Sequence, residues 1–220
     1  MPTTLSHPSS RRERRSIELR ERLFRAAIQL FARKGFAETT VEDITNAADV
    51  GKGTFFNYFP SKEHILGAFG RLQISKVQAA ADAAPSTRLP IQTFLRNLAF
   101  DVISKPAQNP AVVRALLQAN LSSEPVRETM REIHGMATAL LARIIEVGQQ
   151  RGEIRKDLAA NDIAPVLRQS LLGAMLIWSL YGDGSLESRI ENVFKVLWNG
   201  MAAHVELPRS AVSPEEGKSR

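Results

Sequence analysis

Apolar residues recur every three to four positions through most of the chain, which is the period of an amphipathic α-helix. The first such stretch runs from Ser16 to Lys34, with Arg33 and Lys34 at its end and Gly35 directly after it. Basic residues suit the negative C-terminal end of a helix, and glycine suits the left-handed residue that follows. The pattern therefore predicts a long first helix that ends at Lys34.

Two short helices are expected next. Thr40 is a suitable N-cap, and Asp43, three residues on, resembles a capping box. Asp49 lies in the following turn and belongs to a residue type that tolerates the left-handed conformation. A second short helix is expected at Lys52–Phe59 and ends before Pro60, because the residue before a proline disfavours the helical conformation. Two short helices with a tight turn, braced by a longer helix, are typical of a helix-turn-helix DNA reader.

The rest of the chain shows longer helical patterns. Ser61 is expected to cap a fourth helix that runs to about Ala84. The remaining helices are expected at Ile91–Ser104, Ala111–Leu121, Pro125–Gln150, Asn161–Tyr181 and Ser185–His204. No segment alternates apolar and polar residues with β-branched enrichment, so no sheet is expected. The predicted fold class is all-α, with an N-terminal three-helix helix-turn-helix domain followed by a C-terminal helical bundle.

The second short helix carries a cluster of aromatic residues between two lysines. Phe55 and Phe59 are four residues apart and should share its inner face. The outer surface is then left to Lys52, Thr54, Phe56, Asn57 and Tyr58. Asparagine can pair with an adenine edge, threonine can contact a thymine methyl, and lysine and tyrosine can reach phosphates. The alternative is a short core helix with solvated lysines, but the turn, the caps and the basic flank together favour a reading helix.

Composition supports a polyanionic partner and excludes some chemistry. The 220 residues carry a formal net charge of +6 and include no cysteine, so disulfides and thiolate metal sites are absent. With four scattered histidines, neither a metal nor a cofactor is expected. Residues 1–14 are predicted to be a disordered basic arm that includes Arg11, Arg12 and Arg14, and residues 206–220 a disordered tail.

The stretch "AAIQLFARKGFAETTVEDITNAADVGKGTFFNYFPSKEHIL" resembles the N-terminal domain of the TetR/AcrR transcriptional regulators. The similarity runs from about Arg15 to Leu66 and combines "LFARKGF", "TTVEDI" and "GKGTFFNYFPSKE". The resemblance implies a cytoplasmic homodimer with a DNA-binding domain at 15–62 and an all-helical effector-binding and dimerisation domain at 63–205. It also implies a regulator, most commonly a repressor, that binds a palindromic operator and is released by a small molecule.

The resemblance also implies which residues contact DNA. Thr40 and Lys62 would contact phosphates, and the reading surface would consist of Lys52, Gly53, Thr54, Phe56, Asn57 and Tyr58. The chain departs from the family pattern at four positions, namely Thr45, Asp49, Gly51 and Phe56. Gly51 removes a side-chain cap from the reading helix, and Phe56 removes a tyrosine hydroxyl that would otherwise reach a phosphate.

Effector and dimer residues are assigned on weaker grounds. Candidate effector contacts among the helices from Ser61 to Leu180 are Phe69, Phe94, Phe100, Met130, His134, Met175 and Trp178. The last two helices, pairing with a symmetry mate as a four-helix bundle, would form a dimer interface with Leu167, Leu171, Ile190, Phe194, Leu197 and Met201. In both cases the alternative is that these residues belong to the subunit's own core.

Two other classes of function remain as alternatives. An enzyme would need a catalytic motif, and the chain contains no nucleophile elbow, phosphate-binding loop or metalloprotease signature. A membrane-surface protein would use the basic amphipathic segment from Arg11 to Lys34. That segment carries Glu13, Glu18 and Glu21 among its arginines, which weakens attraction to anionic lipid, so no membrane partner is expected.

Overall fold

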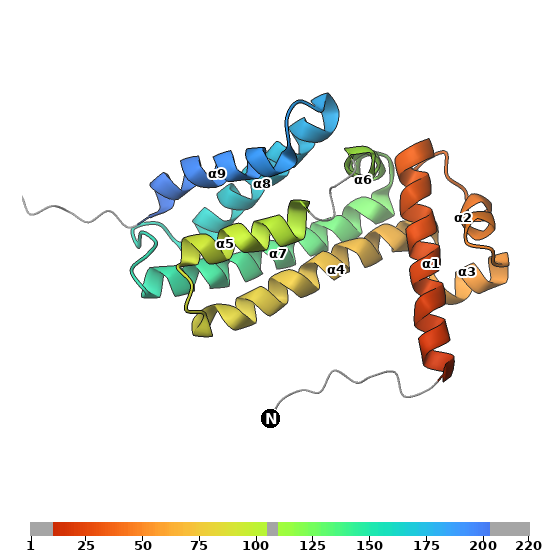
Figure 1. Ribbon diagram of the computed structural model, residues 1–220, viewed down its shortest axis with the longest axis horizontal. Coiled ribbons are helices and arrows are strands. Elements are labelled where there is room, and N and C mark those ends of the chain that lie inside the picture. Colours follow the sequence, from red (N-terminus) through yellow and green to blue (C-terminus); the bar gives the residue numbers. More distant parts are fainter. Residues whose placement is uncertain (1–10, 105–109, 203–220) are drawn as a thin grey trace, which may run out of the picture.

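The computed structural model describes residues 11–104 and 110–202, and helices account for nearly all of this part of the chain (Figure 1). In chain order the helices are α1 (Arg11–Lys34), α2 (Val41–Ala47), α3 (Lys52–Tyr58), α4 (Lys62–Ala83), η1 (Ala84–Ser86), α5 (Ile91–Ala99), η2 (Phe100–Ser104), α6 (Pro110–Ser122), α7 (Glu124–Gln150), α8 (Ala160–Tyr181) and α9 (Leu186–Met201). The β pairing in the described residues is one isolated antiparallel bridge between Ile154 and Ala202. The all-α fold class is confirmed.

The first helix is longer than the sequence pattern predicts. α1 begins at Arg11, five residues before Ser16, so Arg14 and Arg15 lie on its first turns rather than in an arm. The expectation of a disordered arm is therefore wrong for residues 11–14. Arginine and glutamate are good helix formers, and the run from 11 to 15 contains nothing else. The rest of that arm, residues 1–10, and the tail from 206 to 220 lie outside the described residues.

Local signals set the boundaries of the first three helices as expected. Gly35 has a φ of +86° and its N–H donates to the Phe31 carbonyl at 3.0 Å, which ends α1. Asp49 has a φ of +51°, and it is the only residue other than glycine with a positive φ in the described part of the chain. The left-handed turn between α2 and α3 that was predicted at Asp49 is confirmed.

The capping box of α2 is also present. The Thr40 hydroxyl accepts from the Asp43 N–H at 3.0 Å, and the Asp43 carboxylate accepts from the Thr40 N–H at 2.9 Å. Lys34 lies 2.9 Å from the other carboxylate oxygen of Asp43. Hydrogen bonds from Lys34 and then from Thr40 lower the pKa of Asp43 to about 2. This carboxylate therefore stays ionised and ties the end of α1 to the start of α2.

Two apolar cores are visible, and the first crosses the expected domain boundary. α1, α2 and α3 bury Phe31, Ile44 and Phe55, and α4 adds Ile65 and Leu66. The same cluster includes five residues from α6 and α7, namely Ala115, Ala119, Val126, Met130 and Ile133. The three N-terminal helices therefore pack on one end of the bundle, as Figure 1 shows, and share their core with it.

The second core lies within the C-terminal bundle, where α4, α5, α7, α8 and α9 pack together. α4 and α7 cross closely at Gly70, where a Cβ atom would overlap the Ile133 side chain. The helix predicted as Ile91–Ser104 changes at Phe100 into a π-helical turn, η2. The wider turn changes the direction of the side chains that follow it, and such turns often occur at functional sites.

Candidate DNA-reading helix and effector cavity

α3 separates its aromatic residues between core and solvent. Phe55 and Phe59 are buried, as expected for an inner face, whereas Phe56 is 54% exposed. Thr54 and Tyr58 are half-buried, and Asn57 is exposed. The outer surface of α3 is therefore formed by residue types that can contact base edges and phosphates.

The start of α3 is open to close approach. No atom lies within 4 Å of the position that a Cβ would occupy at Gly51 or Gly53, so neither glycine is required by packing within the chain. The N-cap Gly51 provides no side-chain cap, as its departure from the family pattern predicted. Lys52 lies 2.9 Å from the exposed carboxylate of Glu42. An exposed pair of this kind contributes only about 0–1 kcal/mol, so the lysine is available to a phosphate at small cost.

Lys62, an expected phosphate contact, is engaged within the chain. Its ammonium group donates to the carbonyls of Phe36 and Thr39 at 2.9 Å and of Ala37 at 3.1 Å. A lysine has three donors, and all three are used here. The expected phosphate contact conflicts with this arrangement, because the ammonium would have to abandon carbonyls that have no helical partner. Lys62 instead connects the start of α4 to the loop between α1 and α2.

Thr40 is exposed, but its hydroxyl is also engaged within the chain. Its Oγ1 lies 2.9 Å from Asp43 Oδ2 and donates to it, in addition to accepting from the Asp43 N–H. A phosphate contact by this hydroxyl requires its proton to turn away from Asp43. Among the predicted DNA contacts, those without such an internal bond are Gly53, Thr54, Phe56, Asn57 and Tyr58.

A cavity of about 410 Å³ lies in the C-terminal bundle, between α4, the α5–η2 segment, α6, α7 and α8. Its volume is within the range of small-molecule sites, about 300–1,000 Å³. Its walls are mostly aliphatic, and the polar side chains that line it are Gln73, Asn120, His134 and Arg168.

Four of the seven predicted effector contacts line this cavity, namely Phe69, Met130, His134 and Met175. The other three, Phe94, Phe100 and Trp178, do not. Phe94 precedes the cavity-facing Leu95 by one residue and is rotated off that face by about 100°. The Phe100 ring lies 4.9 Å from the Arg96 guanidinium, and Trp178 is buried beyond the last α8 residues that line the cavity.

Arg168 is the charged cavity residue that the sequence analysis did not predict, and the polar Gln73 and Asn120 were not predicted either. A single arginine within the apolar run of α8 was the available signal. Its Nη1 donates to His134 Nδ1. Burial, and then the positive charge of Arg168, lower the pKa of His134, and burial lowers the pKa of Arg168. The Arg168 Nε atom and the Gln73 amide oxygen are buried without a hydrogen-bond partner in the described part of the chain.

The predicted dimer residues lie mainly in the subunit's own core. Leu167, Leu171, Ile190, Phe194 and Met201 are buried within one chain, so they cannot form an interface, and only Leu197 is half-buried. The apolar side chains that α8 and α9 expose are Val166, Ile177, Leu180, Tyr181 and Val196. The predicted residues therefore belong mainly to the subunit's own core, the alternative that the sequence left open, and the exposed apolar residues lie on other faces of the same two helices.

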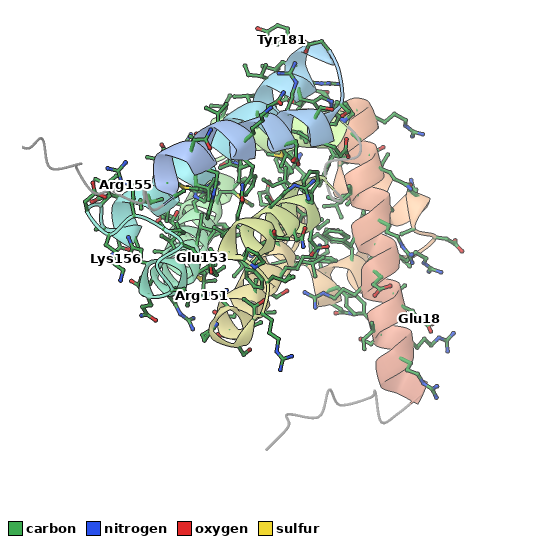
Figure 2. All side chains as sticks on the ribbon, turned by 60° about the vertical axis from the view of Figure 1, so that its left-hand side comes forward. Glu18, Arg151, Glu153, Arg155, Lys156 and Tyr181 are labelled. Carbon is green, nitrogen blue, oxygen red and sulfur yellow. The ribbon has the colours of Figure 1, made fainter. Side chains whose placement is uncertain are left out.

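α8 carries most of this exposed apolar surface, which we call the α8–α9 face and define by those five residues. Tyr181 is 72% exposed, and Figure 2 shows it at the outer end of α8. The helix has 22 residues with a hydropathy of 1.4 in its most apolar window, of which 28% is buried, so by length and composition alone it could cross a membrane. The same length, hydropathy and low burial also fit a helix whose exposed side is covered by a partner.

In residues 11–104 and 110–202, no three histidine, aspartate or glutamate side chains are grouped so that they could hold a metal ion. The described site consists of a helix-turn-helix with an exposed reading helix, a mostly apolar cavity lined by four polar side chains, and α4 and α6 between them. This combination defines an all-helical DNA-binding protein with a ligand cavity.

Comparison with known proteins agrees with this class. The model for bacterial regulatory proteins of the tetR family matches residues 23–69, and the model for tetracyclin repressor-like C-terminal domains matches residues 111–194. The chain is 30% identical to the HTH-type transcriptional regulator EthR of Mycolicibacterium smegmatis over 171 residues, which are 75% of this chain and 79% of EthR. It is 29% identical to the HTH-type transcriptional repressor DhaR of Mycobacterium sp. strain GP1 over 163 residues, 72% of this chain and 81% of DhaR.

Solved structures show the same fold. Thermus thermophilus FadR, a TetR-family transcriptional repressor in complex with lauroyl-CoA, has a TM-score of 0.61 and 28% identity, covering 89% of this chain and 98% of FadR. Bacillus subtilis FadR has a TM-score of 0.71 and 21% identity, covering 82% of this chain and 98% of that chain. The chain belongs to the TetR family of transcriptional regulators.

Proposed function

We propose that this protein is a transcriptional repressor that binds a palindromic operator as a homodimer in the cytoplasm and releases it when a small apolar molecule fills the cavity. The observation that carries the proposal is the course of α4. This helix starts at Lys62, directly after the reading helix, and further along it contributes Gln73, Ile74 and Val77 to the cavity wall. One rigid element therefore connects ligand and DNA.

DNA reading is assigned to the exposed side of α3. In a dimer two such helices enter successive major grooves about 34–36 Å apart. Asn57 would pair with a base edge, and Thr54 would bond to a base or touch a thymine methyl. Lys52 and Tyr58 would contact phosphates. Phe56 is exposed among them and is suited to a thymine methyl or a sugar face rather than to a phosphate.

The α8–α9 face is proposed as the dimer interface. Its five residues are exposed on adjacent helices, and two copies related by a two-fold axis would bury them against each other in a four-helix arrangement. The dimer would then fix the distance between the two α3 helices, which sets the half-site spacing.

α6 offers a second connection between the cavity and the three N-terminal helices α1, α2 and α3, which we call the reading head. Its Val113 and Leu116 line the cavity, while Ala115 and Ala119 belong to the core that it shares with α1. Its Arg114 donates to the Ser179 carbonyl on α8, the proposed interface helix. A ligand that displaces α6 or α4 would shift α3 relative to its dimer mate, and decisive release needs a ligand preference of about 5.5 kcal/mol for the released state.

The effector is expected to be largely apolar because the cavity wall is aliphatic. The complex of Thermus thermophilus FadR with lauroyl-CoA shows that a relative with 28% identity accepts an acylated molecule. A ligand with a hydrocarbon portion that fits about 410 Å³ is proposed here also.

The proposal is tested on the DNA that flanks the gene for this chain. A duplex with an inverted repeat from that region is expected to retain the protein in a mobility-shift assay, whereas a duplex with one half-site scrambled should not. Asn57→Ala should relax discrimination at one operator position by about 1–3 kcal/mol, with Asn46→Ala, an exposed residue at the end of α2, as the matched control. Equal affinity for intact and scrambled duplexes would contradict the proposal.

A further inference from the structure

The wall of the cavity carries an unbalanced positive charge. Among the described residues that line it, Arg168 is the only lysine or arginine, and none is an aspartate or glutamate. Elsewhere the described arginines commonly pair with carboxylates, as Arg96 does with Glu191 at 2.6 Å. The partner of Arg168 is the imidazole of His134, which is neutral when its Nδ1 accepts a hydrogen bond.

An arginine in this position costs free energy unless its charge is compensated. The Arg168 side chain is half-buried, and because arginine remains protonated in proteins, the part of its charge that is withdrawn from water has no compensating anion. Its Nε atom is buried and donates to nothing in the described residues. One N–H of a fork that normally binds an anion is thus left unsatisfied beside an apolar cavity.

We infer that the cavity binds a compact apolar molecule with a single carboxylate, and that this carboxylate pairs with the Arg168 guanidinium. The inference rests on the proposed function, in which this cavity holds the effector, and specifies its chemical class. A carboxylate matches the planar fork of arginine through paired, charge-assisted hydrogen bonds. The aliphatic wall then takes the hydrocarbon part of the molecule.

A second unsatisfied group adds detail to the site. The Gln73 amide oxygen is a buried acceptor without a donor, and it belongs to α4, whereas Arg168 belongs to α8. A hydroxyl on the ligand, or a water carried in with the carboxylate, would satisfy this oxygen. The bound acid would then connect the helix that begins beside the DNA reader with the helix that carries the proposed interface.

A free acid fits this wall better than a coenzyme A ester. A thioester carbonyl is uncharged and would leave Arg168 without a counter-ion. The nucleotide and phosphates of coenzyme A bring several negative charges, whereas the described residues of the cavity wall include one cation. The cavity volume of about 410 Å³ also lies near the lower end of the range for ligand pockets. The structure therefore favours the acid over the ester.

The test compares acids with uncharged molecules of the same shape. Dodecanoate and 4-phenylbutanoate, the corresponding alcohols, and lauroyl-CoA are titrated into the full chain by calorimetry. At least one acid is expected to bind about tenfold or more tightly than its alcohol. Arg168→Gln should abolish that preference, whereas Arg131→Gln, which removes an exposed arginine of α7 outside the cavity, should retain it.

Three results would overturn the inference. They are equal binding of acids and alcohols by the unaltered chain, an acid preference that survives Arg168→Gln, and binding of lauroyl-CoA without binding of any acid. The first and third need no variant, so they decide the question even if Arg168→Gln fails to fold. Failure of the proposed function would be seen separately, because the chain would then not bind the inverted-repeat duplex in a mobility-shift assay without any ligand.

Discussion

Lys62 Nζ lies 4.6 Å above the ring of Phe36 and donates to the carbonyl of the same residue at 2.9 Å. With the carbonyls of Ala37 and Thr39, this residue gives Lys62 a complete set of acceptors. The loop between α1 and α2 is thereby held against the first turn of α4. Lys62 is thus in a position to fix where the reading head sits on the bundle.

Lys62→Gln is expected to lower the free energy of unfolding by about 1–3 kcal/mol, because it removes charge-assisted hydrogen bonds to three loop carbonyls, two of them in partly buried surroundings. Operator affinity should fall, but the slope of affinity against salt concentration should not change. Lys52→Gln is the matched comparison and should reduce that slope by about 1. Mobility-shift titrations over a salt series measure both. If Lys62→Gln reduced the slope of operator affinity against salt concentration, Lys62 would be a phosphate contact after all.

Gly70→Ala is expected to destabilise the protein because its Cβ would overlap Ile133 where α4 crosses α7. Gly135→Ala, on α7, meets no atom within 4 Å and gains the same helix propensity, so it is the control. The difference in unfolding free energy between the two variants should be about 1–3 kcal/mol, the cost of overpacking. Urea unfolding measures it, and equal stabilities would show that the Ile133 side chain can move aside for the added methyl group.

Val196→Glu is expected to convert a dimer into a monomer. Val196 is 70% exposed in one chain, and a carboxylate on the α8–α9 face would be buried without a counter-ion in the dimer, at a cost of several kcal/mol. Light scattering should give twice 24.3 kDa for the unaltered chain and 24.3 kDa for the variant. Leu121→Glu, which places the same charge on an exposed residue of α6, should remain dimeric. Dissociation of both variants, or of neither, would contradict this interface.

Acidification should destabilise the protein through His134. Its pKa is lowered in the folded chain from the usual 6.5 by burial and by Arg168. As the pH falls below 6.5 the unfolded chain binds a proton that the folded chain resists, so this stabilising contribution is complete above 6.5 and is lost toward the lowered pKa. His134→Gln keeps an acceptor for Arg168 and should flatten the decline.

The comparison is made by urea unfolding from about pH 8 to about pH 5, the range in which histidines titrate. His64→Gln, which removes an exposed imidazole outside the cavity, serves as the control. An unchanged pH dependence in His134→Gln would exclude this residue as a source of the acid sensitivity.

Features decided by neighbours in sequence could be predicted. The left-handed residue at Asp49, the capping box of Thr40 and Asp43, and the inner positions of Phe55 and Phe59 depend on residues at most four positions apart. The helix order follows from the same local patterns.

Features decided by packing between distant elements could not be predicted. Lys62 meets carbonyls that lie 23 to 26 residues earlier, and Arg168 meets His134 across 34 residues. α9 has apolar residues on several faces, so its rotation depends on what α8 and α5 present to it. The sequence therefore indicated the helix but not that Ile190 and Phe194 face the subunit's own core.

The core that α1, α2 and α3 share with α6 and α7 limits how the reading head can be transferred between regulators. A chimaera that takes residues up to 66 from this chain would leave Phe31 and Ile65 facing foreign helices. Ala119 and Met130 from this chain would have to be transferred with them. Exchange of DNA specificity in this protein is therefore better attempted by replacing the outer positions of α3 than by grafting the whole head.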